Sequence, residues 1–194
     1  MTIPPEQNPV ADTNGQFAAV GQSGPVWFLA GTLGGAAERT VTVPAGKALF
    51  FPMLNNLWVT TCVGDPRTIA EIRPLIAPFI DAAQGLDVEI DGVSVANLAE
   101  YLVESPLFCT SLTLFGVNVA ADLAAFCPGG TPYPDCGNLP NPQEHYGTPV
   151  GFGPAMTIGY HLMLAPLKAG HHTIHFTATS GDFSVDVTYH LTVK

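Results

Sequence analysis

The chain has 194 residues, of which 47% are hydrophobic and only 11% charged, and its 16 acidic and 6 basic side chains give a net charge of -10. This length predicts one domain with a substantial core. The acidic balance argues against binding to a nucleic-acid phosphate backbone and against docking on anionic lipid. No apolar run approaches about 18 residues, so the sequence predicts no membrane span.

The four cysteines favour an oxidising compartment, because none is spaced as CxxC and few histidines lie nearby. We expect two disulfides, Cys127–Cys136 closing a short loop and Cys62–Cys109 by elimination, with four buried thiols in a cytosolic protein as the alternative. Met1–Pro5 lacks the basic and apolar regions of a signal peptide. The expectation is therefore a secreted or periplasmic protein whose signal peptide has been removed. The lack of an Asn-x-Ser/Thr sequon favours a bacterial source.

The first half of the chain predicts an N-terminal arm, short strands and one helix. Residues 1–24 are polar and rich in proline and glycine, which indicates an extended arm. Strands are expected at 26–30, 39–43 and 47–54, the last buried on both faces because it is apolar nearly throughout. Asp65-Pro66 begins a helix whose apolar residues recur from Ile69 to Ile80, and Pro74 and Pro78 should kink or split it.

The middle of the chain predicts smaller elements and one long loop. These are a hairpin at 86–95 turning at Asp91-Gly92, a helical turn at 97–103, a strand at 107–114 and a short helix at 118–126. The segment 126–155 is rich in proline and glycine and is too long for a simple connection. We interpret it as a lid or binding loop, and a tolerated insertion is the alternative. Its chemically interesting residues are Tyr133, Asp135, Glu144, His145 and Tyr146.

Three strands at 156–164, 171–178 and 183–193 alternate strictly between apolar and polar residues. The polar face gathers four of the six histidines, His161, His171, His175 and His190, together with Asp186. A two-residue turn at Ser180-Gly181 would place His171 opposite His190 and His175 opposite Asp186, with Cβ atoms roughly 5 Å apart. A hairpin through 166–170 would bring His161 diagonally close to the same group.

Two kinds of chemistry could use this histidine face. His171 and His190, helped by His161 or by a residue from a loop, would suit zinc or copper, with Glu144 or Asp186 as the general base for a zinc-activated water. Alternatively, His175 and Asp186 could activate a nearby hydroxyl in a metal-free hydrolase, although no nucleophile motif is present. The plainest interpretation is a solvated face on which His175 and Asp186 form a surface ion pair.

A different candidate site lies just after the strand at 47–54. Trp58, beside Asn55 and Asn56, would offer an aromatic platform with amide donors for a sugar. Large aromatic residues are highly buried on average, so a core position for Trp58 is the alternative.

Several stretches form a specific pattern across most of the chain. They are VWFLAGT (26–32), VPAGK (43–47) with FFP (50–52), IDG (90–92), SPLF (105–108), GY (159–160) with LMLAPL (162–167), and VTYHLTV (187–193). Together they resemble a set of uncharacterised secreted bacterial proteins. The resemblance implies a secreted β-rich domain and carries no activity.

The sequence thus predicts a mainly β protein, a β-sandwich or jelly-roll-like domain over 25–194 with short helices in the crossovers. The first functional hypothesis is a secreted, non-catalytic module that binds a glycan, another protein or copies of itself. Under this hypothesis the arm could add to the sheet edge of a neighbour. The alternatives are a zinc or copper protein using the strand histidines and a metal-free hydrolase.

Overall fold

The computed structural model describes residues 7–110 and 152–194, and its fold is mainly β and consistent with the β-sandwich-like domain that the sequence predicts. The chain divides into two compact units. Unit 1 takes in the described residues of Met1–Asn8, Asn56–Pro78 and Glu104–Ile158, and unit 2 takes in Pro9–Asn55, Phe79–Val103 and Gly159–Lys194. No helix in the described part of the chain is long and apolar enough to cross a membrane.

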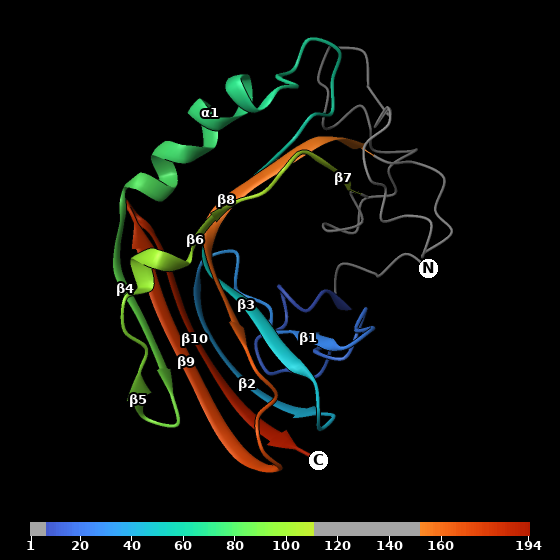
Figure 1. Cartoon of the computed structure of the whole chain (residues 1–194), viewed down its shortest axis with the longest axis vertical. Coiled ribbons are helices and arrows are strands. Elements are labelled where there is room, and N and C mark those ends of the chain that lie inside the picture. Colours follow the sequence, from blue (N-terminus) through green and yellow to red (C-terminus); the bar gives the residue numbers. More distant parts are fainter. Residues whose placement is uncertain (1–6, 111–151) are drawn as a thin grey trace. The chain divides into compact units, whose positions relative to one another are not determined.

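Two five-stranded sheets are formed by the described residues (Figure 1). The first has the order β1-β3-β8-β6, with β7 paired to β8, and the second has the order β2-β10-β9-β4-β5. The strands are β1 (Val26–Phe28), β2 (Gly35–Val43), β3 (Ala48–Val59), β4 (Ala83–Ile90), β5 (Val93–Ser94), β6 (Leu102–Glu104), β7 (Phe108–Thr110), β8 (Phe152–Leu164), β9 (Gly170–Ser180) and β10 (Phe183–Val193). The helical elements among them are α1 (Ile69–Asp81) and the 3₁₀ turn η2 (Leu98–Tyr101).

The core of unit 2 lies between the two sheets. On β9 and β10 the buried residues alternate with exposed ones, as the sequence predicts. Phe51 of β3 stacks on Phe176 of β9 with ring centroids 5.1 Å apart, so one sheet packs on the other through these rings. The expectation that β3 is buried on both faces is wrong in unit 2, because Phe50 and Pro52 are partly exposed while Leu49, Phe51 and Met53 are buried.

The predicted register of β9 and β10 is wrong by two residues. Ser180 pairs with Phe183, so the turn is Gly181-Asp182 rather than Ser180-Gly181. Gly181 has φ 55°, a value that a type II′ turn requires at its first central position. A shift of two residues keeps every side chain on its face, so the hydrophobic pattern cannot distinguish the two registers.

The chain between β8 and β9 passes from one sheet to the other. The sequence predicted a hairpin here, but β8 belongs to the sheet of β1 and β3 while β9 pairs with β10 and β4. His161 on β8 therefore does not join the histidines of β9 and β10. This prediction is wrong because a five-residue loop fits a sheet-to-sheet crossing as well as it fits a hairpin.

The predicted helix and the predicted Asp-Gly hairpin are both present. The expected start at Asp65-Pro66 is wrong, since the Asp65 carboxylate accepts from the Thr61 and Cys62 N–H groups and α1 begins at Ile69. Thr68 caps α1: its hydroxyl accepts from the Glu71 N–H while the Glu71 carboxylate accepts from the Thr68 N–H, which is a capping box. The helix runs unbroken from Ile69 to Asp81 through both prolines, so the expected split does not occur. Asp91 and Gly92 join β4 to β5 with φ values of 53° and 76°, as a type I′ turn requires.

The described part of the predicted arm, from residue 9 onward, folds onto unit 2 as a series of turns. Arg39 points inward from β2, is 1% exposed, and donates to the carbonyls of Asp12 and Gly31 and to the Tyr189 hydroxyl. Burial favours a higher pKa for Asp12, but backbone N–H donors from Phe17, Asn14 and Gly15 and the nearby guanidinium outweigh it and lower the pKa. Arg39 thus anchors the N-terminal segment to the sheet.

The cysteines are only partly covered by the described residues. Cys62 and Cys109 are both disulfide-bonded. Cys127 and Cys136 lie outside the described residues, as do the helix expected at 118–126 and the loop 126–155 up to residue 151. The pairing of the four cysteines therefore stays a prediction.

Candidate functional site

The histidines of the polar face of β9 and β10 each have a separate neighbour. His175 Nε2 donates to Asp186 at 2.9 Å, and His190 Nε2 donates to Glu38 of β2 at 2.8 Å. His171 Nδ1 lies 3.3 Å from the Thr192 hydroxyl. The expected His175–Asp186 pair is therefore present, although as a diagonal contact, since His175 is directly opposite Thr188.

The expected direct pairing of His171 with His190 is wrong. The observed register places His171 opposite Thr192 and His190 opposite Thr173, and His161 lies on the other sheet. Within residues 7–110 and 152–194, no group of three or more histidine, cysteine, aspartate or glutamate residues is arranged to hold a metal ion. The three predicted ligands are therefore not brought together as a metal site in these residues, although His171 and His190 are diagonal neighbours as His175 and Asp186 are.

The hydrolase hypothesis requires a hydroxyl that His175 can activate. The Nε2 atom of His175 is engaged by Asp186, and the Thr177 hydroxyl donates to the Gly85 carbonyl. Asp186 is 60% exposed, so the pair lies at the surface, where an ion pair contributes little to stability. This arrangement matches the interpretation of a solvated face better than that of a catalytic pair.

The sugar platform predicted around Trp58 stays a prediction. Asn55 is exposed and belongs to unit 2, whereas Asn56 and Trp58 belong to unit 1. Trp58 is half-buried. The Asn56 amide donates to the Ile76 carbonyl and accepts from the Leu57 N–H, so it is used within unit 1. Glu144, the proposed general base, lies outside the described residues.

A row of aromatic side chains that the sequence interpretation missed crosses the outer face of β1, β3 and β8. Phe28 pairs in register with Phe50, and their rings meet edge to face at 5.8 Å. The Phe50 ring stacks on the His161 ring at 5.6 Å, and Met163 lies two residues further along the same face of β8. We call these four residues the aromatic strip.

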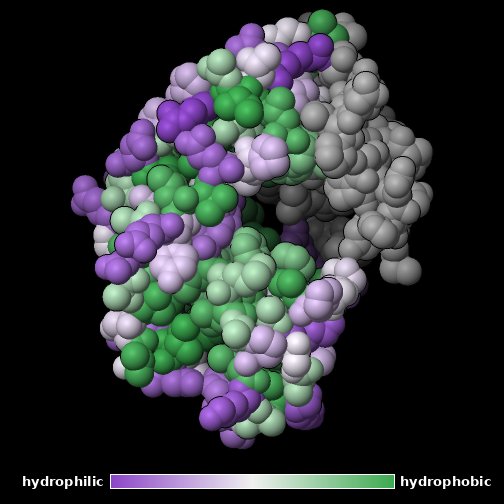
Figure 2. Space-filling view, viewed as in Figure 1, coloured by the Kyte–Doolittle hydropathy of each residue, from purple (hydrophilic) through white to green (hydrophobic). Residues whose placement is uncertain are grey.

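The aromatic strip is partly exposed and uncharged. Phe28 is 53% exposed and Met163 is 59% exposed. Burial lowers the pKa of His161, against a smaller opposing effect of its Nδ1–H bond to the Gly159 carbonyl, so this ring is neutral at pH 7. Figure 2 shows hydrophobic residues gathered over the lower half of the viewed face, the half in which Figure 1 labels β3.

The edge of β1 is closed by a side chain of the same chain. The Gln22 amide accepts from the Phe28 N–H at 2.9 Å and donates to the Phe28 carbonyl at 2.7 Å. These contacts occupy the backbone groups that an incoming strand would use. The outer face of the sheet, rather than this edge, is therefore the surface available for contact.

Alternation in 47–54 could have indicated the aromatic strip, since Phe50 and Pro52 lie on one face and Leu49, Phe51 and Met53 on the other. Because all five are apolar, the sequence alone could not show which face is covered. No protein-family model, curated protein or solved structure matches the chain.

Proposed function

We propose that this chain is a non-catalytic binding module that assembles with a second copy of itself through the aromatic strip. The observation that supports the proposal is the row of Phe28, Phe50, His161 and Met163 on the outer face of the sheet. Exposed apolar surface of this kind is typical of protein contact sites, and methionine adapts to a partner's shape.

Charge supports a second copy as the partner. Each copy carries a net charge of -10, so two copies repel unless they meet through a neutral surface. The outward residues of this part of the sheet include no aspartate, glutamate, lysine or arginine: they are Val26, Phe28, Ala48, Phe50, Pro52, Gly159, His161 and Met163. In a two-fold interface centred on the aromatic strip, no carboxylate of one copy would therefore face a carboxylate of the other at the centre.

Sedimentation velocity over a range of protein concentrations tests this proposal. We expect the wild-type protein to shift from monomer to dimer as concentration rises, and Phe28→Ser/Met163→Ser to stay monomeric. Val93→Ser is the matched control, because Val93 is 69% exposed on the β4–β5 hairpin, away from the aromatic strip. A wild-type protein that stays monomeric at all concentrations, or a control that loses association equally, would overturn self-assembly.

We also propose that the protein works in a secreted or periplasmic compartment. Disulfide-bonded Cys62 and Cys109 support this, because disulfides persist in oxidising environments. Peptide mapping by mass spectrometry without reduction would identify the pairs, and four free thiols in protein from its natural host would contradict the proposal.

A further inference from the structure

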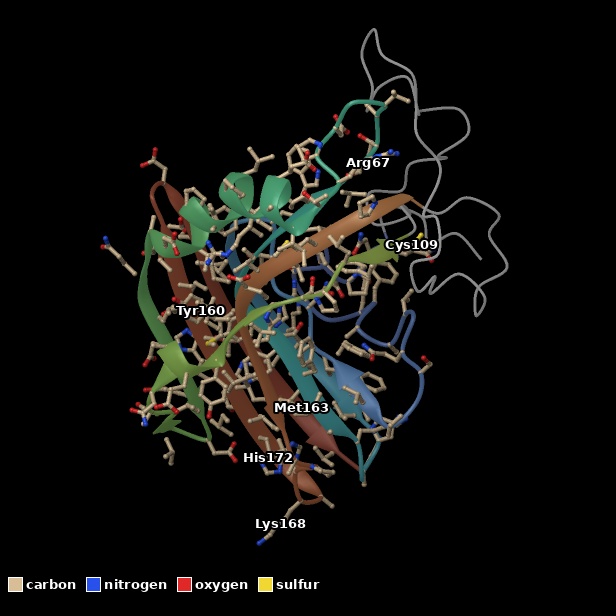
Figure 3. The ribbon with its side chains drawn as sticks, turned by 45° about the horizontal axis from the view of Figure 1, so that its top comes forward. Arg67, Cys109, Tyr160, Met163, Lys168 and His172 are labelled. Carbon is tan, nitrogen blue, oxygen red and sulfur yellow. The ribbon has the colours of Figure 1, made fainter. Side chains whose placement is uncertain are left out.

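The three lysines of the chain lie at one end of unit 2. Lys47 directly precedes β3, Lys168 lies in the loop between β8 and β9, and Lys194 follows β10. Figure 1 draws the C-terminus, the β2–β3 turn and the β8–β9 loop at the lower end, and Figure 3 shows Lys168 extending away from that end. We call these three residues the lysine tip.

Backbone pairing explains why the three lysines meet. The Ala45 N–H in the β2–β3 turn donates to the Lys194 carbonyl at 2.9 Å, which holds the turn with Lys47 against the end of β10. Val193, the residue before Lys194, pairs with Gly170, two residues after Lys168. Residues separated by more than 140 positions in the sequence are thus held at one end of the sandwich.

Acidic residues are absent from the strand ends that form this surface. The segments 40–51, 161–173 and 190–194 contain no aspartate or glutamate, although the whole chain has 16. Asp91 approaches this end but is engaged by His172 at 2.7 Å. The lysine tip therefore carries an excess of positive side chains on an acidic protein.

The other positive side chains of the described residues are committed elsewhere. Arg39 is buried in unit 2, whereas Arg67 and Arg73 belong to unit 1, where Arg73 is paired with Glu104 at 2.9 Å. At the tip, the Lys47 ammonium donates to the Gly24 carbonyl, which leaves two of its three N–H groups for a ligand. Lys168 and Lys194 are exposed.

We propose that the lysine tip binds a linear anionic polysaccharide, one that carries carboxylate or sulfate groups. A flexible polymer can contact only the lysine tip and so avoid the acidic surfaces that would repel it elsewhere on the protein. A lipid surface fits less well, since the exposed turn residues Pro44, Ala45, Gly46, Ala165 and Pro166 provide no bulky apolar side chain for insertion. This inference does not depend on self-assembly through the aromatic strip.

Binding to immobilised heparin at neutral pH and about 10 mM salt, where screening is weak, tests the proposal. A protein with a sequence pI of about 4.7 should be excluded from heparin unless a local surface binds it. We expect the wild-type protein to be retained, to elute as salt rises, and to pass through a neutral dextran resin. Lys168→Gln/Lys194→Gln should weaken the apparent affinity about tenfold or more.

Lys168→Gln alone is compared with Arg73→Gln as its matched control, because each change removes one positive charge and Arg73 belongs to unit 1 rather than to the lysine tip. Arg73→Gln should be retained like the wild type, and thermal unfolding should show that every variant is folded. Exclusion of the wild-type protein from heparin would overturn the proposal. So would equal losses in the tip and control variants, or binding to phosphatidylglycerol vesicles without binding to heparin.

Discussion

At the scale of single residues, His172 is held between two hydrogen-bond acceptors. Its Nδ1 lies 2.7 Å from the Asp91 carboxylate and its Nε2 lies 2.9 Å from the Lys168 carbonyl. Neither partner can donate, so both ring nitrogens must carry a proton to satisfy both bonds. The bond to Asp91, followed by the bond to Lys168, raises the pKa of His172, and the bond from His172 lowers the pKa of Asp91.

These shifts predict a pH-dependent contribution to stability. Because the pKa of His172 is higher in the folded than in the unfolded protein, its protonation stabilises the fold. This stabilisation is fully present below the unfolded-state pKa of about 6.5 and is lost as pH rises through the folded-state pKa. We expect the difference in free energy of unfolding between wild type and His172→Gln to be largest near about pH 6 and to shrink by about pH 9. Because Asp91 is 47% exposed, the difference should not exceed about 1 kcal/mol.

Urea denaturation across this pH range measures the effect. His171→Gln is the control, since the exposed His171 ring faces the neutral hydroxyl of Thr192. If the two variants showed the same pH profile, the ion pair between His172 and Asp91 would not be the source of the dependence.

Tyr189 provides a second prediction at the residue scale. Its hydroxyl donates to the Ala30 carbonyl at 2.7 Å and accepts from Arg39 at 2.7 Å in the core of unit 2, and burial raises its pKa. Tyr189→Phe should lower the free energy of unfolding by about 1.5–3 kcal/mol, because a buried charged donor loses its acceptor. The exposed Tyr101→Phe should change it by less than about 0.5 kcal/mol in the same urea titration.

At the scale of elements, the approach of β8 to β3 depends on one glycine. A Cβ atom at Gly159 would lie 2.5 Å from the Leu54 carbonyl oxygen and from the Asn55 Cβ atom, both held by β3. Gly159→Ala should therefore lower the free energy of unfolding by about 1–3 kcal/mol, as overpacking does. At Gly31 the nearest atom would be 3.7 Å away, so Gly31→Ala should be neutral or slightly stabilising in thermal unfolding. Equal effects of the two changes would contradict this account of the strand contact.

Local periodicity predicted which residues form β9 and β10 and which face each side chain takes. It did not predict the register of the two strands or which strand β8 pairs with. The alternation in 171–178 and 183–193 assigned each side chain to its correct face, and the apolar spacing from Ile69 to Ile80 located the helix, although its expected cap at Asp65 was wrong. The same alternation could not exclude a two-residue shift, which is why His171 was expected opposite His190. It also could not show that β8 joins β3 instead of β9.

At the scale of the whole molecule, composition describes average charge and the fold decides where charge lies. The net charge of -10 is an average over the whole chain. It gave no indication that Lys47, Lys168 and Lys194 lie together, because their proximity results from pairing between distant strands. The heparin experiment tests the lysine tip and the sedimentation experiment tests the aromatic strip. Composition alone predicts neither surface.

Sequence by itself determined the mainly β class, the faces of the C-terminal strands, the Asp-Gly hairpin and the single described helix. Each of these depends on residues close together in the chain, whose spacing sets which side chains share a face. Only the tertiary structure decided the strand register, the inward position of Arg39, the aromatic strip and the lysine tip. Those features depend on which distant strands pair and on which face is covered, and neither is encoded in local spacing.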